Sequence, residues 1–244
     1  MGEVKIQVCI TTFERAESLG LLLTDLEREG ARHVRIYDDC SQTDYATPTA
    51  LAQRNGWKWL RAAKNHGKTG FSCLLDGIWR DLAQDPAEFY VFLQDDNRLC
   101  SRFFERVLNT WDSIESSRKA TLMLMTDTRD AIWGATKPKR LGSADRIGWV
   151  DNIYAAPPRT LRDFGYRFPG VSVAAGATGS GAGRGLTLAL RQLGRKMYRA
   201  NPSLIAHVGL PSRMHAAERE KHPLIAVNFV DGEARHEQLM RGER

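Results

Sequence analysis

The first half of the sequence alternates apolar runs with amphipathic segments, and this alternation constrains the fold most strongly. Residues 89–93 are uninterruptedly apolar and run straight into Gln94-Asp95-Asp96. Residues 15–29 instead place leucines at the three-four spacing of an amphipathic helix. Continuous apolar strands that alternate with helices predict an α/β fold with a mostly parallel sheet and helices on both faces.

The same pattern predicts the remaining elements. Strands are expected at 5–10, 33–37, 57–60, 89–93 and 120–125. Helices are expected at 15–29, 47–55, 71–82, 103–113 and 186–196. Residues 137–163 look irregular, and the composition of the charged tail from about residue 232 permits disorder. Six glycines between Gly170 and Gly185 suit either a lid or a phosphate-cradling loop.

Charge is distributed unevenly along the 244 residues. Residues 1–136 hold 17 basic and 20 acidic side chains, a net charge of −3, whereas residues 137–244 hold 18 and 9, a net charge of +9. The second half therefore suits an anionic partner, although a solvated basic surface is the simpler alternative. No apolar run is long enough to span a bilayer and no signal peptide is evident, so a cytoplasmic protein is expected.

Two acidic pairs follow predicted strands, Asp38-Asp39 and Asp95-Asp96. Ligands of parallel sheets bind beyond the carboxyl ends of the strands. Adjacent carboxylates at a buried strand end raise each other's pKa unless a cation neutralises them, and Mg²⁺ or Mn²⁺ suits carboxylate oxygen. A solvated turn explains each pair about equally well. A carboxylate of the first pair could also accept hydrogen bonds from a uracil ring or a ribose hydroxyl.

Three segments together resemble the GT-A glycosyltransferases, nearest the large family-2-like group. Residues 6–15 read Ile-x-Val-x-Ile-Thr-Thr-Phe-x-Arg, residues 36–41 read Ile-Tyr-Asp-Asp-Cys-Ser, and residues 92–97 read Phe-Leu-Gln-Asp-Asp-Asn. They are similar to the opening strand, the Asp-Asp-Gly-Ser strand end and the Asp-x-Asp motif of that group, over roughly residues 4–110. Gln94-Asp95-Asp96 departs from Asp-x-Asp but resembles a Glu-Asp-Asp variant of the same fold.

The resemblance implies a nucleotide-sugar donor, with a UDP-sugar favoured, and a Mn²⁺ or Mg²⁺ cofactor. It implies that Asp96, with Asp95 beside it, meets the metal and the sugar. The other implied donor-site residues are Thr11 and Arg15 in the pocket, Asp39 or Asp38 at the base, and Asn65 and Lys68 flanking the nucleotide. Residues 1–115 would form the donor-binding half and residues 116–244 the acceptor-binding, catalytic half of one domain.

A second resemblance lies at residues 201–213, which are similar to a Pro-Ser-Leu-x-x-His-x-Gly-x-x-Ser stretch of several GT-A enzymes. It implies that His207 ligates the metal and that Ser212 and Arg213 contact phosphate oxygens. His66 has no such context and is expected at the surface. An acidic motif that would carry the catalytic base is replaced by Thr-Gly-Ser-Gly, so Asp151 is the substitute candidate beside Asp96, with a helix cap or turn as its alternative.

The acceptor is inferred from composition. The basic second half also carries Trp133, Trp149, Tyr154, Tyr166 and Phe168. Cationic and aromatic side chains suit nucleic acid, so the favoured acceptor is a hydroxymethylated pyrimidine in DNA, such as that of a bacteriophage. Synthesis of lipopolysaccharide or capsule at an anionic membrane face, with peripheral membrane contact, needs the same charge. A nucleotidyltransferase and a non-catalytic nucleic-acid-binding protein remain as further alternatives.

Overall fold

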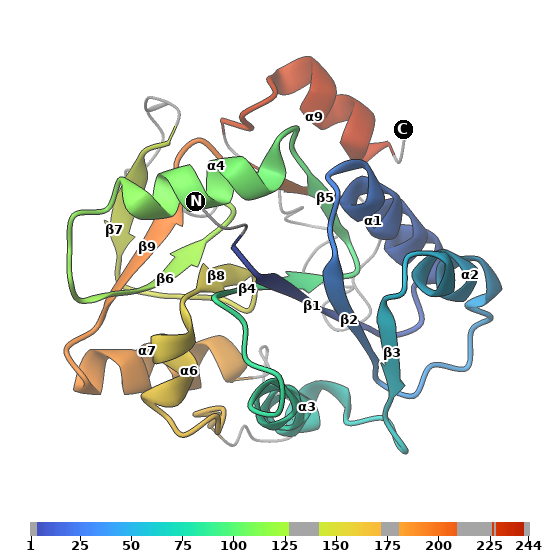
Figure 1. The fold of residues 1–244 in the computed structure, drawn as a ribbon, viewed down its shortest axis with the longest axis horizontal. Coiled ribbons are helices and arrows are strands. Elements are labelled where there is room, and N and C mark those ends of the chain that lie inside the picture. The colour runs from blue at the N-terminus through green and yellow to red at the C-terminus, as the bar shows by residue number, and fades with distance from the viewer. Residues whose placement is uncertain (1–3, 127–141, 172–180, 209–225, 227, 242–244) are drawn as a thin grey trace.

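The computed structural model describes residues 4–126, 142–171, 181–208, 226 and 228–241. Within these ranges an eight-stranded sheet has the order β3-β2-β1-β4-β8-β6-β9-β7, and β5 pairs with β10 in a second, two-stranded sheet (Figure 1). The strands are β1 Ile6–Thr12, β2 His33–Asp38, β3 Lys58–Arg61, β4 Phe89–Gln94, β5 Asn97–Leu99, β6 Lys119–Met123, β7 Ala144–Ile147, β8 Tyr154–Ala156, β9 Lys196–Ala200 and β10 Ile205–His207.

The first four strands confirm the predicted parallel half of the sheet. Strand β1 is central, pairing in parallel with β2 on one side and with β4 on the other. The register sets Thr12 opposite Asp38 and Thr11 opposite Gln94, so β1, β2 and β4 all end at one edge. Both acidic pairs therefore come to the same edge of the sheet, as the sequence predicts.

The second half of the sheet is less regular than the first. Strand β8 enters between β4 and β6 and is antiparallel to both, and β7 is antiparallel to β9. The expectation of irregular structure at residues 137–163 was wrong for its described part, which holds β7, β8 and a short helix. These strands have three or four residues, too few to show a period in the sequence.

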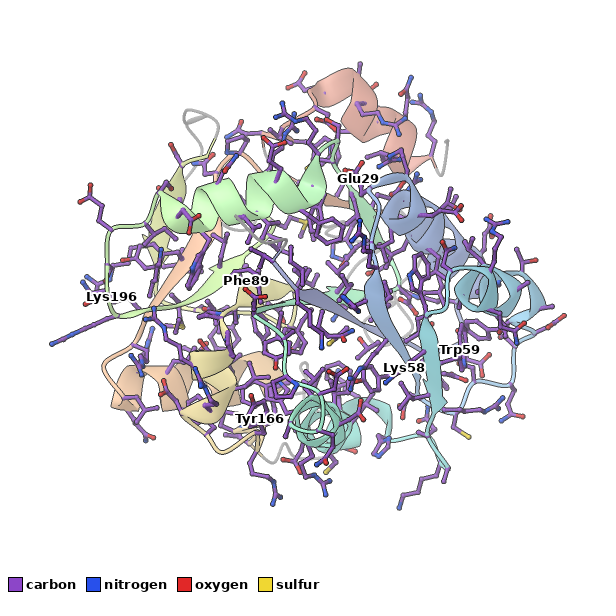
Figure 2. All side chains as sticks on the ribbon, in the orientation of Figure 1. Glu29, Lys58, Trp59, Phe89, Tyr166 and Lys196 are labelled. Carbon is purple, nitrogen blue, oxygen red and sulfur yellow. The ribbon has the colours of Figure 1, made fainter. Side chains whose placement is uncertain are left out.

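Helices cover both faces of the sheet (Figure 1). One face carries α1 Ala16–Arg28, α2 Ala46–Arg54, α4 Phe103–Asp112 and α9 Glu233–Met240, and the other carries α3 Gly67–Leu82, α6 Pro158–Arg162 and α7 Ala182–Gln192. Each face has its own buried apolar cluster, and side chains fill the space between the layers (Figure 2). No helix among the described residues is long and apolar enough to cross a membrane.

Glycines of the predicted lid or phosphate loop are partly explained by packing. Helix α7 begins at Ala182, four residues before the predicted start. A Cβ on Gly183 would lie 2.8 Å from the carbonyl oxygen of Val150, and one on Gly185 would lie 2.1 Å from that of Pro169. These two glycines let the helix approach the neighbouring backbone closely. Residues 172–180 of the same segment lie outside the described residues.

The end of the chain differs from the expectation of a disordered tail, because residues 233–240 form α9. Leu239 is fully buried in the cluster that it shares with α1 and α4. His236 is 8% exposed and its ring lies 5.7 Å from that of Phe229. Two apolar contacts in a charged segment give little sequence signal, so only the tertiary packing reveals this helix.

Acid is expected to weaken the docking of α9. Burial lowers the pKa of His236 from its ordinary value of 6.5, although Glu237 and Glu233 oppose the shift. Below about pH 6.5 the His236 imidazole is protonated in the unfolded chain but remains neutral in the folded chain. The contribution of His236 to the free energy of unfolding is therefore present above about pH 6.5 and falls as the pH drops below it. The melting temperature of the wild type should fall more between about pH 7 and 5.5 than that of His236→Phe. Parallel curves would contradict this.

Candidate functional site

The acidic pair after β4 is buried and densely hydrogen-bonded. Asp95 is 6% exposed and Asp96 is 2% exposed. Asp95 Oδ2 accepts hydrogen bonds from the hydroxyl of Thr12 at 2.9 Å and from the amide of Phe13 at 3.1 Å. Burial first, and then the charge of Asp96, raises the pKa of Asp95 to about 7. A solvated turn, the alternative interpretation of this pair, is therefore wrong.

Arg15 supplies the positive charge that this pair requires. Its Nη1 lies 2.5 Å from Asp96 Oδ2 and 3.3 Å from Asp95 Oδ1. Burial alone lowers the pKa of Arg15, but the charges of Asp96 and Asp95 outweigh this effect and raise it. Arg15 immediately precedes α1, so the first turn of that helix places the guanidinium against the ends of β1 and β4. The resemblance implies a place for Arg15 in the donor pocket, and its pairing with these two carboxylates is a contact that the structure adds.

His207 approaches the same carboxylates from the second half of the chain. It is 2% exposed, and its Nδ1 lies 3.2 Å from Asp96 Oδ1 without the geometry of a hydrogen bond. Neither ring nitrogen has a hydrogen-bond partner within the described ranges, which is costly for a buried imidazole. Strand β10 brings it there, because His207 pairs with Asn97 of β5, next to Asp96.

This arrangement fits a divalent cation held by few protein ligands. No group of three or more His, Cys, Asp or Glu residues in the described part of the chain is arranged to hold a metal ion. Asp96 and His207 together offer one carboxylate and one imidazole whose ring nitrogens have no hydrogen-bond partner among the described residues. Mg²⁺ and its analogues are commonly bound by one or two protein groups and completed by water and substrate phosphates. The residues present therefore suit a cation that arrives with a diphosphate.

The first acidic pair accepts backbone amides at the end of β2 and the start of α3. The carboxylate of Asp39 accepts the amides of His66, at 3.0 and 3.1 Å, and of Gly67, at 3.3 Å. It also lies 2.6 Å from His66 Nδ1. Asp39 thus caps the start of α3, and His66, expected as a plain surface residue, is half-buried and bonded to it. Asp38 Oδ1 accepts the amide of Ser41 at 2.9 Å.

The other predicted nucleotide-site residues lie along this edge. The side-chain amide of Asn65 donates to the carbonyl of Asp39 at 3.1 Å. Lys68 is half-buried in the first turn of α3, and Thr11 is half-buried on β1 between Tyr37 and Gln94. The edge therefore gathers these three residues with both acidic pairs.

Sequence reasoning missed a buried hydroxyl chain behind the acidic pair. Thr12, which donates to Asp95, lies 2.9 Å from the hydroxyl of Tyr45. Tyr45 in turn accepts the amide of Arg15 at 2.9 Å and the hydroxyl of Ser41 at 3.3 Å. Burial raises the pKa of Tyr45, which keeps its hydroxyl protonated. Thr12 and Ser41 belong to the motif segments 6–15 and 36–41, whereas Tyr45 has no such signal in the sequence.

The chain resembles known proteins in structure but not in sequence. No family model matches it, and no curated protein matches its sequence. A mannosyltransferase from Pyrobaculum calidifontis, in complex with GDP-Man and Mn²⁺, matches its structure with a TM-score of 0.53 at 10% identity. S. aureus TarS, residues 1–349, matches with a TM-score of 0.58 at 14% identity. The chain has the GT-A fold.

These GT-A neighbours are longer than the chain. The match covers 83% of the chain but 58% of the mannosyltransferase, and 84% of the chain but 60% of TarS. Glucosyl-3-phosphoglycerate synthase from Mycobacterium tuberculosis, in complex with Mn²⁺ and UDP, has a TM-score of 0.53 at 15% identity, covering 85% of the chain and 73% of that protein. At such identities the likeness shows the fold.

The catalytic-base candidate lies at the same edge of the GT-A sheet as the acidic pair. Phe92 pairs with Tyr154 in the antiparallel register of β4 and β8, so the residues just before β8 lie beside the end of β4. Asp151 is half-buried there and accepts the amide of Asn152 at 2.8 Å, as a turn aspartate does. Ser212 and Arg213 lie outside the described residues.

The aromatic residues expected on an acceptor surface of the GT-A fold divide into two groups. Tyr154 and Phe168 are 2% and 7% exposed and belong to the core, so their predicted surface role was wrong. Tyr166 packs against the same core, whereas Trp149 is 49% exposed two residues before Asp151. Trp133 lies outside the described residues. The structure thus leaves Trp149 as the exposed aromatic beside the edge.

Proposed function

We propose that this chain is a metal-dependent glycosyltransferase that takes a sugar from a nucleoside diphosphate donor, with UDP favoured. The observation that carries the proposal is the buried Asp95-Asp96 pair, which meets Arg15 and His207 at the carboxyl edge of a GT-A sheet. Neighbours of this fold bind GDP-Man with Mn²⁺, or UDP with Mn²⁺. Residues 1–115 would form the donor half, completed by His207 from the acceptor half, 116–244.

In this mechanism the chain's own residues prepare a site for a highly anionic leaving group. Asp96 and His207 would hold the cation, which when bound would neutralise charge on the departing diphosphate. Asp95 is held in place by Thr12 and Phe13, so the pair is pre-organised before any donor arrives. Arg15 balances its negative charge and would line the donor pocket. Asp151 is the proposed base that takes the proton of the acceptor hydroxyl.

Two further groups are proposed to bind the nucleotide. Asp38, Asp39, Asn65 and Lys68 share the edge with Thr11 and are proposed to contact the base and the ribose. The carboxylate of Asp39 would keep its bonds to the amides of His66 and Gly67 while accepting from the nucleotide. Ser212 and Arg213 are proposed to contact the diphosphate on the strength of their sequence motif.

For the acceptor, the net charge of +9 over residues 137–244 and the exposed Trp149 support an anionic, stackable molecule. Hydroxymethylated pyrimidine in DNA is the acceptor that we propose to test first. Steep loss of duplex binding between low and moderate salt would support this acceptor, because phosphate contacts release counterions. Binding to anionic liposomes alone would instead favour an acceptor at a membrane face.

The donor proposal is tested by thermal stabilisation with UDP, GDP and their sugar conjugates, each with and without Mn²⁺. A uridine nucleotide is expected to raise the melting temperature by several degrees only when Mn²⁺ is present, since the ligand binds the folded state. Equal shifts without metal would contradict a shared cation site. No shift with any nucleotide would overturn the proposed function.

A further inference from the structure

Both proposed cation ligands depend on one small piece of structure, the β5–β10 sheet. Asp96 immediately precedes β5 and His207 ends β10. The antiparallel register sets His207 opposite Asn97 and Ala206 opposite Arg98, and the amide of Val208 donates to the carbonyl of Asp96 at 2.7 Å. Each strand has three residues, and an isolated two-stranded sheet is at best marginally stable. Its position must therefore be set by neighbouring elements.

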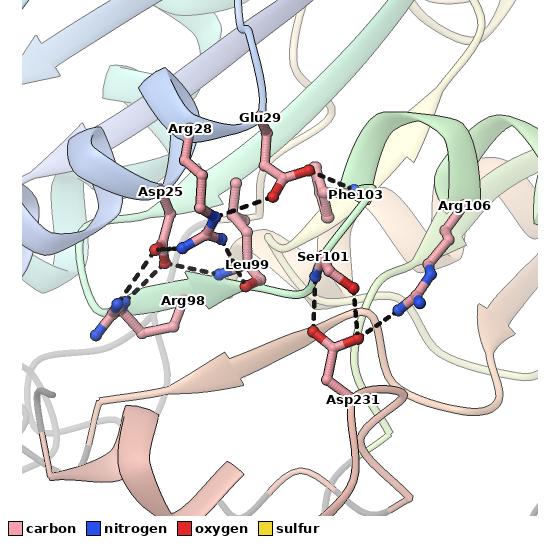
Figure 3. Close-up of polar contacts among 9 residues, drawn as sticks. All are labelled: Asp25, Arg28, Glu29, Arg98, Leu99, Ser101, Phe103, Arg106 and Asp231. Atoms are coloured by element: carbon pink, nitrogen blue, oxygen red, sulfur yellow. Dashed lines mark hydrogen bonds and ion pairs between the residues drawn. The ribbon is translucent and has the colours of Figure 1, made fainter. Parts of the chain in front are cut away.

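Helix α1 holds this sheet through a fully buried ion pair (Figure 3). Asp25 and Arg98 are 0% and 1% exposed. Asp25 accepts from Arg98 Nε at 2.7 Å and from Nη2 at 3.1 Å, and it also accepts the backbone amide of Leu99 at 3.0 Å. The Asp25 carboxylate thus binds both a side chain and a backbone amide of β5.

Neighbouring residues extend the same network (Figure 3). Arg28 donates to Asp25 at 2.7 Å and to the carbonyl of Leu99 at 3.3 Å. Glu29 accepts the amide of Phe103, where α4 begins, at 2.9 Å. Beyond β5, Asp231 accepts the amide and the hydroxyl of Ser101 at 2.6 and 2.8 Å. Strand β5 and the residues that follow it, 100–103, are therefore held in place by hydrogen bonds from α1, from Glu29 and from Asp231.

We propose that the buried Asp25–Arg98 pair positions Asp96 and His207 for cation binding, an inference that rests on the proposed function. Helix α1 starts just after Arg15, which contacts both site carboxylates, and carries Asp25 in its last turns. Helix α1 thus fixes the positions of both Asp95-Asp96 and β5. A buried ion pair adds little stability compared with an apolar pair of similar volume, so fold stability alone does not account for this arrangement. Supporting residues of a metal site commonly change its affinity 10- to 100-fold.

The test compares two buried arginines that differ in place. The double variant Asp25→Leu/Arg98→Met removes the proposed positioning pair and replaces it with an apolar pair that should fold, whereas Arg98→Met alone would leave a buried carboxylate unpaired. Arg35→Met is the matched control, because Arg35 is 3% exposed and bonds Asp81 and Asp85 at the far end of α3. Mn²⁺ binding in the presence of UDP is measured from the free Mn²⁺ electron paramagnetic resonance signal. Coupling between bound Mn²⁺ and the histidine nitrogen is measured by electron spin-echo envelope modulation. Folding is measured by the melting temperature.

We expect the double variant to fold with a somewhat lower melting temperature, because the Leu99 amide loses its acceptor. It should bind Mn²⁺ about tenfold or more weakly and lose the histidine coupling. Arg35→Met should lose stability while keeping Mn²⁺ affinity within about twofold. A folded double variant with wild-type Mn²⁺ affinity and coupling would overturn the inference alone, and so would a double variant that does not fold, since the pair would then serve folding. A wild type that binds no Mn²⁺ with UDP would overturn the proposed function and this inference with it.

Discussion

Asp96→Asn is expected to lower the rate of sugar transfer, or of donor hydrolysis without acceptor, by about 10³-fold. Asp96 is the carboxylate that both Arg15 and His207 approach, so it is the side chain best placed to hold a cation beside the diphosphate. An amide keeps the shape of the side chain but removes the charge that binds the metal. The rate is measured as release of UDP from a UDP-sugar over a series of Mn²⁺ concentrations.

Asp112→Asn is the control, because Asp112 is an exposed carboxylate at the end of α4. It should turn over at the wild-type rate. If Asp96→Asn retained more than about a tenth of that rate at every Mn²⁺ concentration, Asp96 would not be the carboxylate on which the metal-dependent step relies.

Arg15→Met is expected to destabilise the metal-free protein by about 3 to 5 kcal/mol, because it leaves two buried carboxylates without their counter-charge. The side chains of Arg15, Asp95 and Asp96 are 10%, 8% and 2% exposed, so water screens the repulsion poorly. Mn²⁺ should restore much of the lost stability, since the ion supplies positive charge at the same carboxylates. The free energy of unfolding is measured in urea with and without Mn²⁺.

Arg35→Met again provides the comparison, because it breaks an ion pair that no proposed metal ligand shares. Its stability is expected to rise with Mn²⁺ no more than that of the wild type. An equal Mn²⁺ gain in Arg15→Met and Arg35→Met would show that the ion does not replace the guanidinium.

Much of the site could be predicted because its signals are local in the chain. The apolar run at 89–93 passes directly into Asp95-Asp96, and residues 33–37 pass directly into Asp38-Asp39, so a strand and its terminal carboxylates are read together. Parallel pairing then brings all carboxyl ends to one edge, whatever the loops between them do.

Some partners, however, are set by contacts between distant residues that no periodicity encodes. Asp25 and Arg98 are 73 residues apart and Thr12 and Tyr45 are 33 apart, and each pair meets only because helices cover a completed sheet. His66 acquires its partner Asp39 in the same way. The sequence of α9 gives little signal for a helix, because its few apolar residues stabilise it only through their contacts with the core.

The sequence by itself therefore determined the parallel α/β half, the edge where the site forms and the residue types available for a cation and a nucleotide. Only the tertiary structure decided that Arg15 neutralises the acidic pair, that Asp39 is engaged by the start of α3 and that His207 reaches Asp96. The physical reason is that strand ends follow from short-range apolar patterning, whereas charge pairing and burial depend on packing among elements far apart in the chain.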